Sequence, residues 1–180
     1  DGADVVIAED GLITRLEELD YLEDLDRVVF QSDDVTVAKQ TQLEDRLPDI
    51  CWEGEAGVLT KNVGAKEASE VDRIRRAQQI TESVFEDILD VLEPGVTERE
   101  IAAEITYRHL KRGAEAMAFE PIVASGPNGA QPHARPTDRT LREGELVVLD
   151  MGCFRDGYAS DMTRTVSIGQ PPERARRGYE

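Results

Sequence analysis

A predicted β-hairpin over residues 146–166 constrains the fold more than any other stretch of this sequence. The segment reads LVVLDMGCFRDGYASDMTRTV, in which an Arg-Asp-Gly turn joins two apolar-rich runs. Asp-Gly is a frequent pair in two-residue hairpin turns, because both turn residues need positive φ values. If Asp156 and Gly157 are the turn residues, the partner of every other hairpin residue follows. The sequence therefore predicts an antiparallel hairpin with one definite register.

This register sorts the hairpin side chains onto two faces. Asp150 would lie opposite Thr163, and Gly152 opposite Asp161. The two aspartates would then be diagonal neighbours on one face, about 7–8 Å apart at the backbone. We expect that face to carry Val148, Asp150, Gly152, Asp161, Thr163 and Thr165, and the other to carry Val147, Leu149, Met151, Cys153, Met162 and Val166. The second set predicts a core face, and the first predicts a site with two converging carboxylates.

Composition and charge limit the classes of partner. The 180 residues include 38 acidic and 21 basic side chains, for a net charge of -17. Such a chain would repel nucleic acid and anionic membranes, so we expect neither as a partner. The acidic residues are spread along the chain, which indicates a solvated acidic surface. The sequence has two distant cysteines, and it shows neither an apolar run of about 20 residues nor a signal peptide. These features favour a cytoplasmic location.

Residues 1–64 are expected to form part of a small N-terminal α/β domain. Strand candidates lie at residues 5–7, 12–13 and 27–30, and an amphipathic helix over 35–47 would end at Pro48. The segment EGEAGVLTKNVGA at 53–65 has three glycines and little periodicity, so we place a domain boundary there. The chain begins without methionine and stops after a charged segment, so we expect it to be a piece of a longer protein.

Two amphipathic helices should follow this boundary. The first has an apolar stripe that ends before Pro94-Gly95 and consists of Val71, Ile74, Ala77, Thr81, Val84, Phe85, Ile88 and Leu92. The second should begin with a Thr97/Glu100 capping box and end at Gly113, with Ile101, Ile105 and Leu110 on its buried side. We expect His109, on this helix, to be partly buried or on the surface and to have no ligand role, because no acidic or histidine partner stands beside it.

The segment between the second helix and the hairpin contains a further candidate site residue. A strand is expected over 119–124 and a loop over 126–129, and a turn at Gly144 leads into the hairpin. His133 lies between Pro132 and Pro136, which hold the backbone extended around it. A histidine presented by a loop in this way is a candidate site residue.

These motifs together resemble a known enzyme family. The residues concerned are 119–126, Pro132-His133, Gly144-x-x-Val147-x-x-x-Asp150-x-Gly152, Gly157-Tyr158-x-x-Asp161 and Thr163-Arg164-Thr165. They resemble the first half of the catalytic domain of the creatinase/prolidase/aminopeptidase P family, which are metallopeptidases with the pita-bread fold. The resemblance implies an α+β fold in which residues 65–180 are the N-terminal half of a pita-bread domain. Residues 1–64 are similar to the family's smaller N-terminal domain only in general character.

The resemblance also implies roles for three residues. The family holds two divalent metal ions with two Asp, one His and two Glu, and the first two ligands match Asp150 and Asp161. His133 matches the family's histidine beside the substrate, and Thr163 could support a liganding carboxylate. Manganese is preferred as the metal, with cobalt and zinc left open. No residues of this chain match the other three ligands, so we expect the 180 residues alone to bind metal weakly and to hydrolyse nothing.

The function implied is hydrolysis of the peptide bond before proline by an Xaa-Pro aminopeptidase, using a metal-activated hydroxide. The partner would be a peptide or dipeptide with proline in the second position, and a homo-oligomer is left open. The main alternatives are an Xaa-Pro dipeptidase (prolidase) and a catalytically dead pita-bread module that binds peptides or proteins. Methionine aminopeptidase shares the hairpin, but the additional N-terminal unit and the Pro-His-Ala-Arg-Pro segment weigh against it. Creatinase-like amidinohydrolase activity, which also shares the hairpin, stays open.

Overall fold

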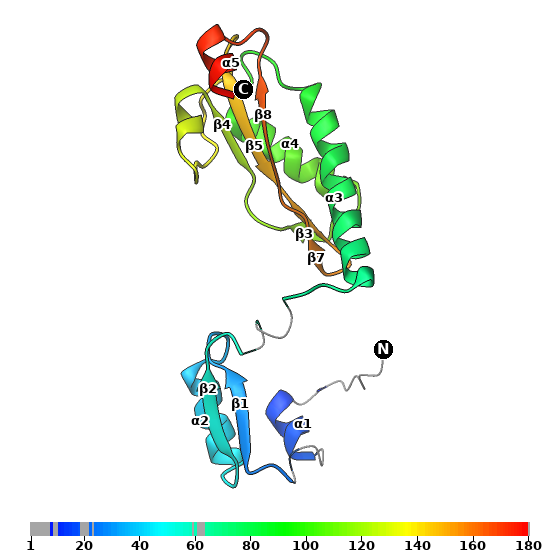
Figure 1. Ribbon diagram of the computed structural model, residues 1–180, viewed down its shortest axis with the longest axis vertical. Coiled ribbons are helices and arrows are strands. Elements are labelled where there is room, and N and C mark those ends of the chain that lie inside the picture. Colours follow the sequence, from blue (N-terminus) through cyan, green and yellow to red (C-terminus); the bar gives the residue numbers. More distant parts are fainter. Residues whose placement is uncertain are drawn as a thin grey trace. The chain divides into compact units, whose positions relative to one another are not determined.

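The computed structural model describes residues 8, 11–18, 22, 24–58, 60 and 64–179. The chain divides into two compact units, residues 1–66 and 67–180 (Figure 1). Within the described residues, none of the helices combines the length and the hydrophobicity that a bilayer span requires.

The first unit is a small α/β arrangement. Strands β1 (Arg27–Gln31) and β2 (Cys51–Glu55) pair in parallel, and helix α2 (Val37–Arg46) connects them. Helix α2 begins at Thr36, whose hydroxyl accepts a hydrogen bond of 3.3 Å from the Lys39 backbone N–H, and it ends just before Pro48, as expected.

One strand prediction in this unit was wrong, and another cannot be judged. Leu12 and Ile13 lie in helix α1 (Leu12–Glu18), where Ile13 is buried. Two apolar residues cannot distinguish strand from helix, and the run LITRLEE is rich in helix-forming residues. The strand expected at residues 5–7 lies outside the described residues.

Two helices form one side of the second unit. Helix α3 (Ala68–Leu89) packs against helix α4 (Glu98–Lys111) and against two short strands of the hairpin tip. The predicted capping box of α4 is present, because the Thr97 N–H donates to the Glu100 carboxylate at 2.8 Å and the Glu100 N–H donates to the Thr97 hydroxyl at 3.2 Å. Gly113, with φ of 87°, follows the end of α4.

The strands of the second unit form two three-stranded sheets. One has the order β4-β5-β8 and the other β3-β6-β7. Their bounds are β3 (Ala116–Met117), β4 (Ile122–Ser125), β5 (Leu146–Met151), β6 (Cys153–Arg155), β7 (Tyr158–Ala159) and β8 (Met162–Ser167). A 3₁₀-helix, η2 (Gly126–Ala130), follows β4, and helix α5 (Glu173–Tyr179) follows β8.

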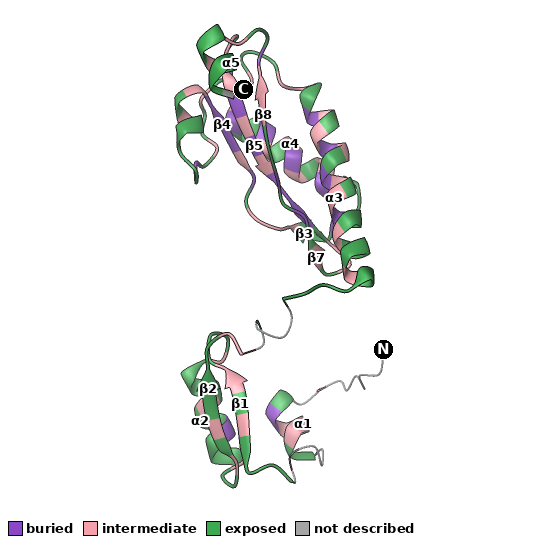
Figure 2. Cartoon of the chain, in the orientation of Figure 1, coloured by how far each residue is buried: buried purple, intermediate pink, exposed green. Residues whose placement is uncertain are grey.

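The hydrophobic core lies between the helices and the β4-β5-β8 sheet. Figure 2 shows buried residues in α3, α4, β4 and β5. The core contains Val84, Ile88, Ile101, Ile105, Val123, Leu141, Val147, Leu149, Met151 and Ile168. Alternate residues of β5 are buried, so Val147, Leu149 and Met151 face the helices as the hairpin register predicted.

Three details of the helix and strand predictions were wrong. Leu110 is 50% exposed, and His109 takes the buried position because it follows Ile101 and Ile105 at helical spacing. Val71 is 39% exposed, since the first turn of α3 precedes the part of the helix that is buried. The strand expected at 119–124 begins only at Ile122, because Pro121 has no N–H to donate to a sheet.

Candidate metal centre

The β5–β8 hairpin positions Asp150 and Asp161. Asp156 and Gly157 have φ of 52° and 74°, so both turn residues adopt the positive values that the sequence predicted. Arg155 pairs with Tyr158, and Asp150 pairs with Thr163, as the predicted register requires. Asp161 lies two residues before Thr163, diagonal to Asp150 across the two strands.

The two carboxylates have different surroundings. Asp150 is half-buried in β5, and its Oδ1 accepts a hydrogen bond of 2.8 Å from the Thr163 hydroxyl. Asp161 is exposed and lies between strands β7 and β8. Among the described residues, its carboxylate has no hydrogen-bond or ion-pair partner. One carboxylate is therefore oriented by a neighbour, whereas the other is open to a ligand.

Gly152 allows a close approach between the two strands beside these carboxylates. A Cβ atom at this position would lie 2.0 Å from the Ser160 carbonyl oxygen and 3.1 Å from the Phe119 ring. The hydrogen-bonded pairing of the two arms of the hairpin is interrupted at Gly152. Before this residue β5 pairs with β8, and after it β6 pairs with β7. Only a residue without a side chain fits, and the carbonyl that it faces belongs to the residue before Asp161.

A buried chain of hydrogen bonds lies behind the interruption. The Cys153 N–H donates to Ser160 Oγ at 3.0 Å, and Ser160 Oγ lies 2.7 Å from Thr81 Oγ1. Thr81 Oγ1 is 3.2 Å from Nε2 of His109. The Nδ1 atom of His109 is 2.9 Å from the Ile105 carbonyl, which can only accept, so we assign the ring proton to Nδ1.

His109 is therefore a structural residue in the core. Its exposed fraction is 0%, whereas the sequence indicated a partly buried or surface position. That prediction was wrong because Thr81, the partner of His109 on helix α3, lies 28 residues away in sequence, a separation that helical spacing does not reveal. Burial lowers the pKa of His109 below its ordinary value and favours the neutral ring.

His133 lies in a turn after η2 and is exposed. The structure records no hydrogen bond between this side chain and either aspartate. The loop that carries it is instead held by Glu98, the first residue of α4, whose carboxylate accepts hydrogen bonds from Ser125, Asn128 and Thr137. Burial by itself would raise the pKa of Glu98, but the hydrogen bonds from Thr137 and Ser125 outweigh it and hold that pKa below its ordinary value.

Sequence reasoning missed Glu98. An acidic residue in the first turn of a helix is common, because it interacts favourably with the helix dipole. The donors that make this carboxylate unusual lie 27 to 39 residues further along the chain. The only local sign is the position of Glu98 next to the capping residue Thr97.

The residues present fit part of a divalent metal site. Carboxylate oxygens are preferred ligands of hard cations, and Asp150 and Asp161 lie diagonally on one face of the hairpin. In the described part of the chain, no group of three or more His, Cys, Asp or Glu side chains is placed to hold a metal ion. Asp150 and Asp161 can therefore supply some of the ligands of such a site.

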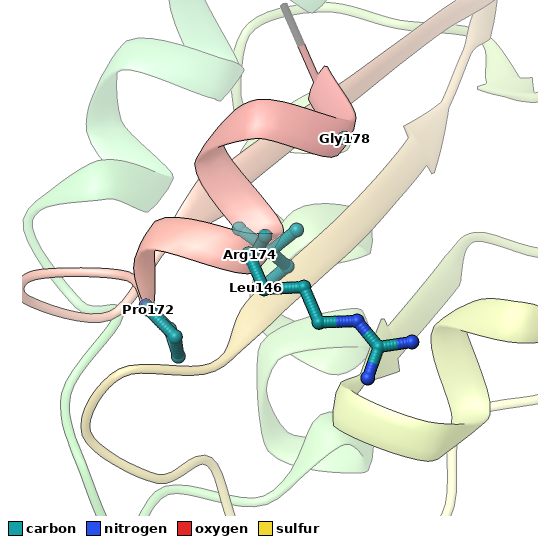
Figure 3. Close-up of a pocket in the computed structure, with 5 residues that line it drawn as sticks. Leu146, Pro172, Arg174 and Gly178 are labelled. Atoms are coloured by element: carbon teal, nitrogen blue, oxygen red, sulfur yellow. The ribbon is translucent and has the colours of Figure 1, made fainter.

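A separate pocket lies away from these residues. Figure 3 shows it between helix α5 and the start of strand β5. Its lining consists of Leu146, Pro172, Arg174, Ala175 and Gly178 and includes none of the candidate site residues.

Known proteins of similar sequence and structure identify the class of the chain. A model of metallopeptidase family M24 matches residues 72–180. An Xaa-Pro dipeptidase from Lactobacillus helveticus is 34% identical over 152 residues, which cover 83% of this chain and 41% of that protein. An X-Pro aminopeptidase from Thermotoga maritima superposes with a TM-score of 0.86 at 29% identity, over 94% of this chain and 49% of that one. An Xaa-Pro dipeptidase from Bacillus anthracis has a TM-score of 0.85 at 30% identity and covers 94% and 48%.

By its fold, the chain is an α+β protein of the pita-bread peptidase class. It belongs to metallopeptidase family M24. The family relationship predicted from the hairpin and histidine motifs is confirmed, and it implies divalent metal ions. The chain spans less than half the length of the curated relatives that it matches.

Proposed function

We propose that the complete protein, meaning the natural polypeptide that contains these 180 residues, is a metal-dependent Xaa-Pro aminopeptidase. Two relatives named Xaa-Pro dipeptidase and structural neighbours named X-Pro aminopeptidase and prolidase support a peptidase that acts next to proline. The observation that carries the proposal is the hairpin register, which puts Asp150 and Asp161 on one face in a chain of this family.

Each site residue has a proposed role. Asp150 and Asp161 would hold divalent cations, and the Thr163 hydroxyl would keep the Asp150 carboxylate oriented. His133 would donate a hydrogen bond to the substrate beside the scissile bond. When bound, the metal ions would lower the pKa of a water molecule and polarise the scissile carbonyl. Manganese is our preferred ion, because carboxylate-rich sites suit it, and cobalt and zinc are the alternatives.

We also propose an assignment of the two parts of the chain. Residues 1–64 would belong to a small N-terminal α/β domain, and residues 65–180 to the pita-bread catalytic domain. The division of the chain into units of residues 1–66 and 67–180 supports this assignment. Cys51 and Cys153 are both free, which supports a reducing compartment such as the cytoplasm.

An Xaa-Pro dipeptidase is the second candidate. The names of the Lactobacillus and Bacillus anthracis relatives favour it, whereas that of the Thermotoga structure favours the aminopeptidase. Assays with an Xaa-Pro dipeptide and with a longer peptide that contains Xaa-Pro distinguish the two activities, since a dipeptidase hydrolyses only the dipeptide. A binding module without activity is disfavoured because Asp150, Asp161 and His133 all match the family pattern.

The test is the variant Asp161→Asn in the complete protein. We expect divalent-dependent cleavage of Xaa-Pro substrates to fall by more than about 100-fold, which exceeds the typical effect of a residue that only supports a metal ligand. Asp156→Asn is the matched control, because it makes the same change at the turn of the same hairpin, where asparagine tolerates a positive φ. Full activity of Asp161→Asn would refute the assignment.

A further inference from the structure

Both ends of the loop that carries His133 are hydrogen-bonded to the same carboxylate. The loop runs from Ser125, at the end of β4, through η2 to Thr137. Its two ends both donate hydrogen bonds to Glu98 on helix α4. Asn128, within η2, donates to the same carboxylate at 3.0 Å from each oxygen. One side chain therefore fixes both ends and an internal point of the loop.

The two oxygens of Glu98 divide these donors between them. Oε1 accepts from the Ser125 N–H at 2.7 Å and from the Ser125 hydroxyl at 2.8 Å. Oε2 accepts from the Thr137 N–H at 3.0 Å and from the Thr137 hydroxyl at 2.6 Å. Each end of the loop thus has its own oxygen, and a group with fewer acceptors could not serve both ends.

Burial makes this arrangement costly to disturb. Glu98 has an exposed fraction of 0%, and in the described part of the chain it forms no ion pair. Arg139 supports the Ser125 end of the loop, because it donates to Ser125 Oγ at 2.6 Å and pairs with Glu145 at 2.5 Å. A buried donor that loses its acceptor costs more than an ordinary hydrogen bond, so the loop geometry depends on both oxygens being present.

Backbone contacts attach the same region to the start of α4. The N–H groups of Glu98 and Arg99 donate to the carbonyls of Arg139 and Thr137 at 3.0 and 3.1 Å. These contacts are made by backbone atoms and do not involve the Glu98 side chain. A change confined to the Glu98 carboxylate would therefore release Ser125, Asn128 and the Thr137 side chain while leaving the helix attached.

We infer that Glu98 is a positioning residue for His133, setting the loop conformation in which this histidine meets the substrate. The inference rests on the role proposed for His133 above. Glu98 does not touch the substrate, because its side chain is fully buried. Its effect on the reaction passes through Ser125, Asn128 and Thr137.

The experiment uses Glu98→Gln in the complete protein, alone and combined with His133→Ala. Glutamine has the shape of glutamate, but its NH₂ group must face the donors of either Ser125 or Thr137. We expect kcat for an Xaa-Pro peptide to fall about tenfold or more, with little change in KM, at a temperature where circular dichroism shows the variant folded. In the His133→Ala background, Glu98→Gln should cause little further loss, because both changes remove the same interaction.

Thr97→Ala is the matched control for a loss of stability alone. Thr97 is the neighbouring residue and caps α4 through its hydroxyl, whose recorded hydrogen bonds are with Glu100 on the same helix. We expect this variant to unfold at a lower temperature and to keep the kcat of the wild type.

The outcomes separate failure of this inference from failure of the proposed function. If Glu98→Gln kept the kcat of the wild type while His133→Ala was impaired, the inference would be overturned and the proposed function would stand. Fully additive losses of kcat in the double variant would have the same meaning. Unchanged kinetics in His133→Ala would remove the proposed role of that histidine and the inference with it. A loss of kcat in Thr97→Ala equal to that in Glu98→Gln would also overturn it, because stability would then explain both.

Discussion

Thr163 donates a hydrogen bond of 2.8 Å from its hydroxyl to Oδ1 of Asp150, its partner across the β5–β8 pair. This hydrogen bond limits the rotation of the Asp150 carboxylate and does not involve its other oxygen, Oδ2. In metal sites, partners of this kind orient the ligand, and their loss typically costs about 10- to 100-fold in affinity or activity.

The substitution Thr163→Val should therefore weaken divalent metal binding by about 10- to 100-fold in the complete protein. Valine keeps the shape of threonine and removes only the hydroxyl. Calorimetric titration with Mn²⁺ measures the effect. Thr165→Val is the control, because Thr165 lies on the same face of β8 opposite Val148. Equal affinities in wild type and Thr163→Val would show that the contact does not support a ligand.

Gly152→Ala should disturb both stability and metal binding. The added Cβ would lie 2.0 Å from the Ser160 carbonyl, so the strands must separate beside Asp161. Overpacking of this kind costs about 1–3 kcal/mol in unfolding free energy. Denaturant unfolding and Mn²⁺ titration of the complete protein would measure the two effects.

Gly157→Ala provides the comparison for that prediction. Gly157 has φ of 74° and nothing within 4 Å of an added Cβ, so alanine there is strained without crowding the site. We expect a loss of about 1–2 kcal/mol from the left-handed backbone, with metal affinity unchanged. If Gly152→Ala also left metal affinity unchanged, the close approach would matter for folding only.

Protonation of His109 should destabilise the folded protein. Burial lowers the pKa of His109 in the folded state, and the positive charge of Arg112 acts in the same direction. The unfolded chain, with a pKa near 6.5, then binds more protons than the folded one. The stabilisation is fully present above about pH 6.5 and decreases as the pH falls below that value.

Chemical denaturation of the complete protein between pH 8 and pH 5.5 would measure this effect. A His109→Gln variant should be less stable overall, because glutamine does not fit the hydrogen bonds to Thr81 and Ile105, but it should lose this part of the pH dependence. The same slope in both proteins would mean that other groups cause it.

The hairpin was predictable because its determinants are local. The Asp156-Gly157 turn fixes the pairing, and the alternation of side chains then gives the faces of Asp150 and Asp161 without knowledge of the rest of the fold. The capping box at Thr97 is equally local. Pro121 is a local signal of the same kind, because a proline without an N–H indicates that the strand begins after it and not at residue 119.

The buried polar residues were not predictable in this way. Glu98 and His109 depend on partners brought together by tertiary packing, from η2 and β4 in one case and from helix α3 in the other. Hydrophobicity alone favours Leu110 as the core residue, but the orientation of helix α4 puts His109 on the buried face. The position of His133 relative to the two aspartates depends in the same way on contacts that no short motif encodes.

The interruption of the ladder at Gly152 has a consequence for how this region can change in evolution. The register is the same on both sides of the interruption, so Asp150 and Asp161 share a face only while the number of residues between each of them and the turn is kept. A single insertion in either arm would move one aspartate to the opposite face unless a bulge absorbed it. We therefore expect changes of length to be tolerated at residues 156–157, whereas within 150–155 or 158–161 they would separate the two carboxylates.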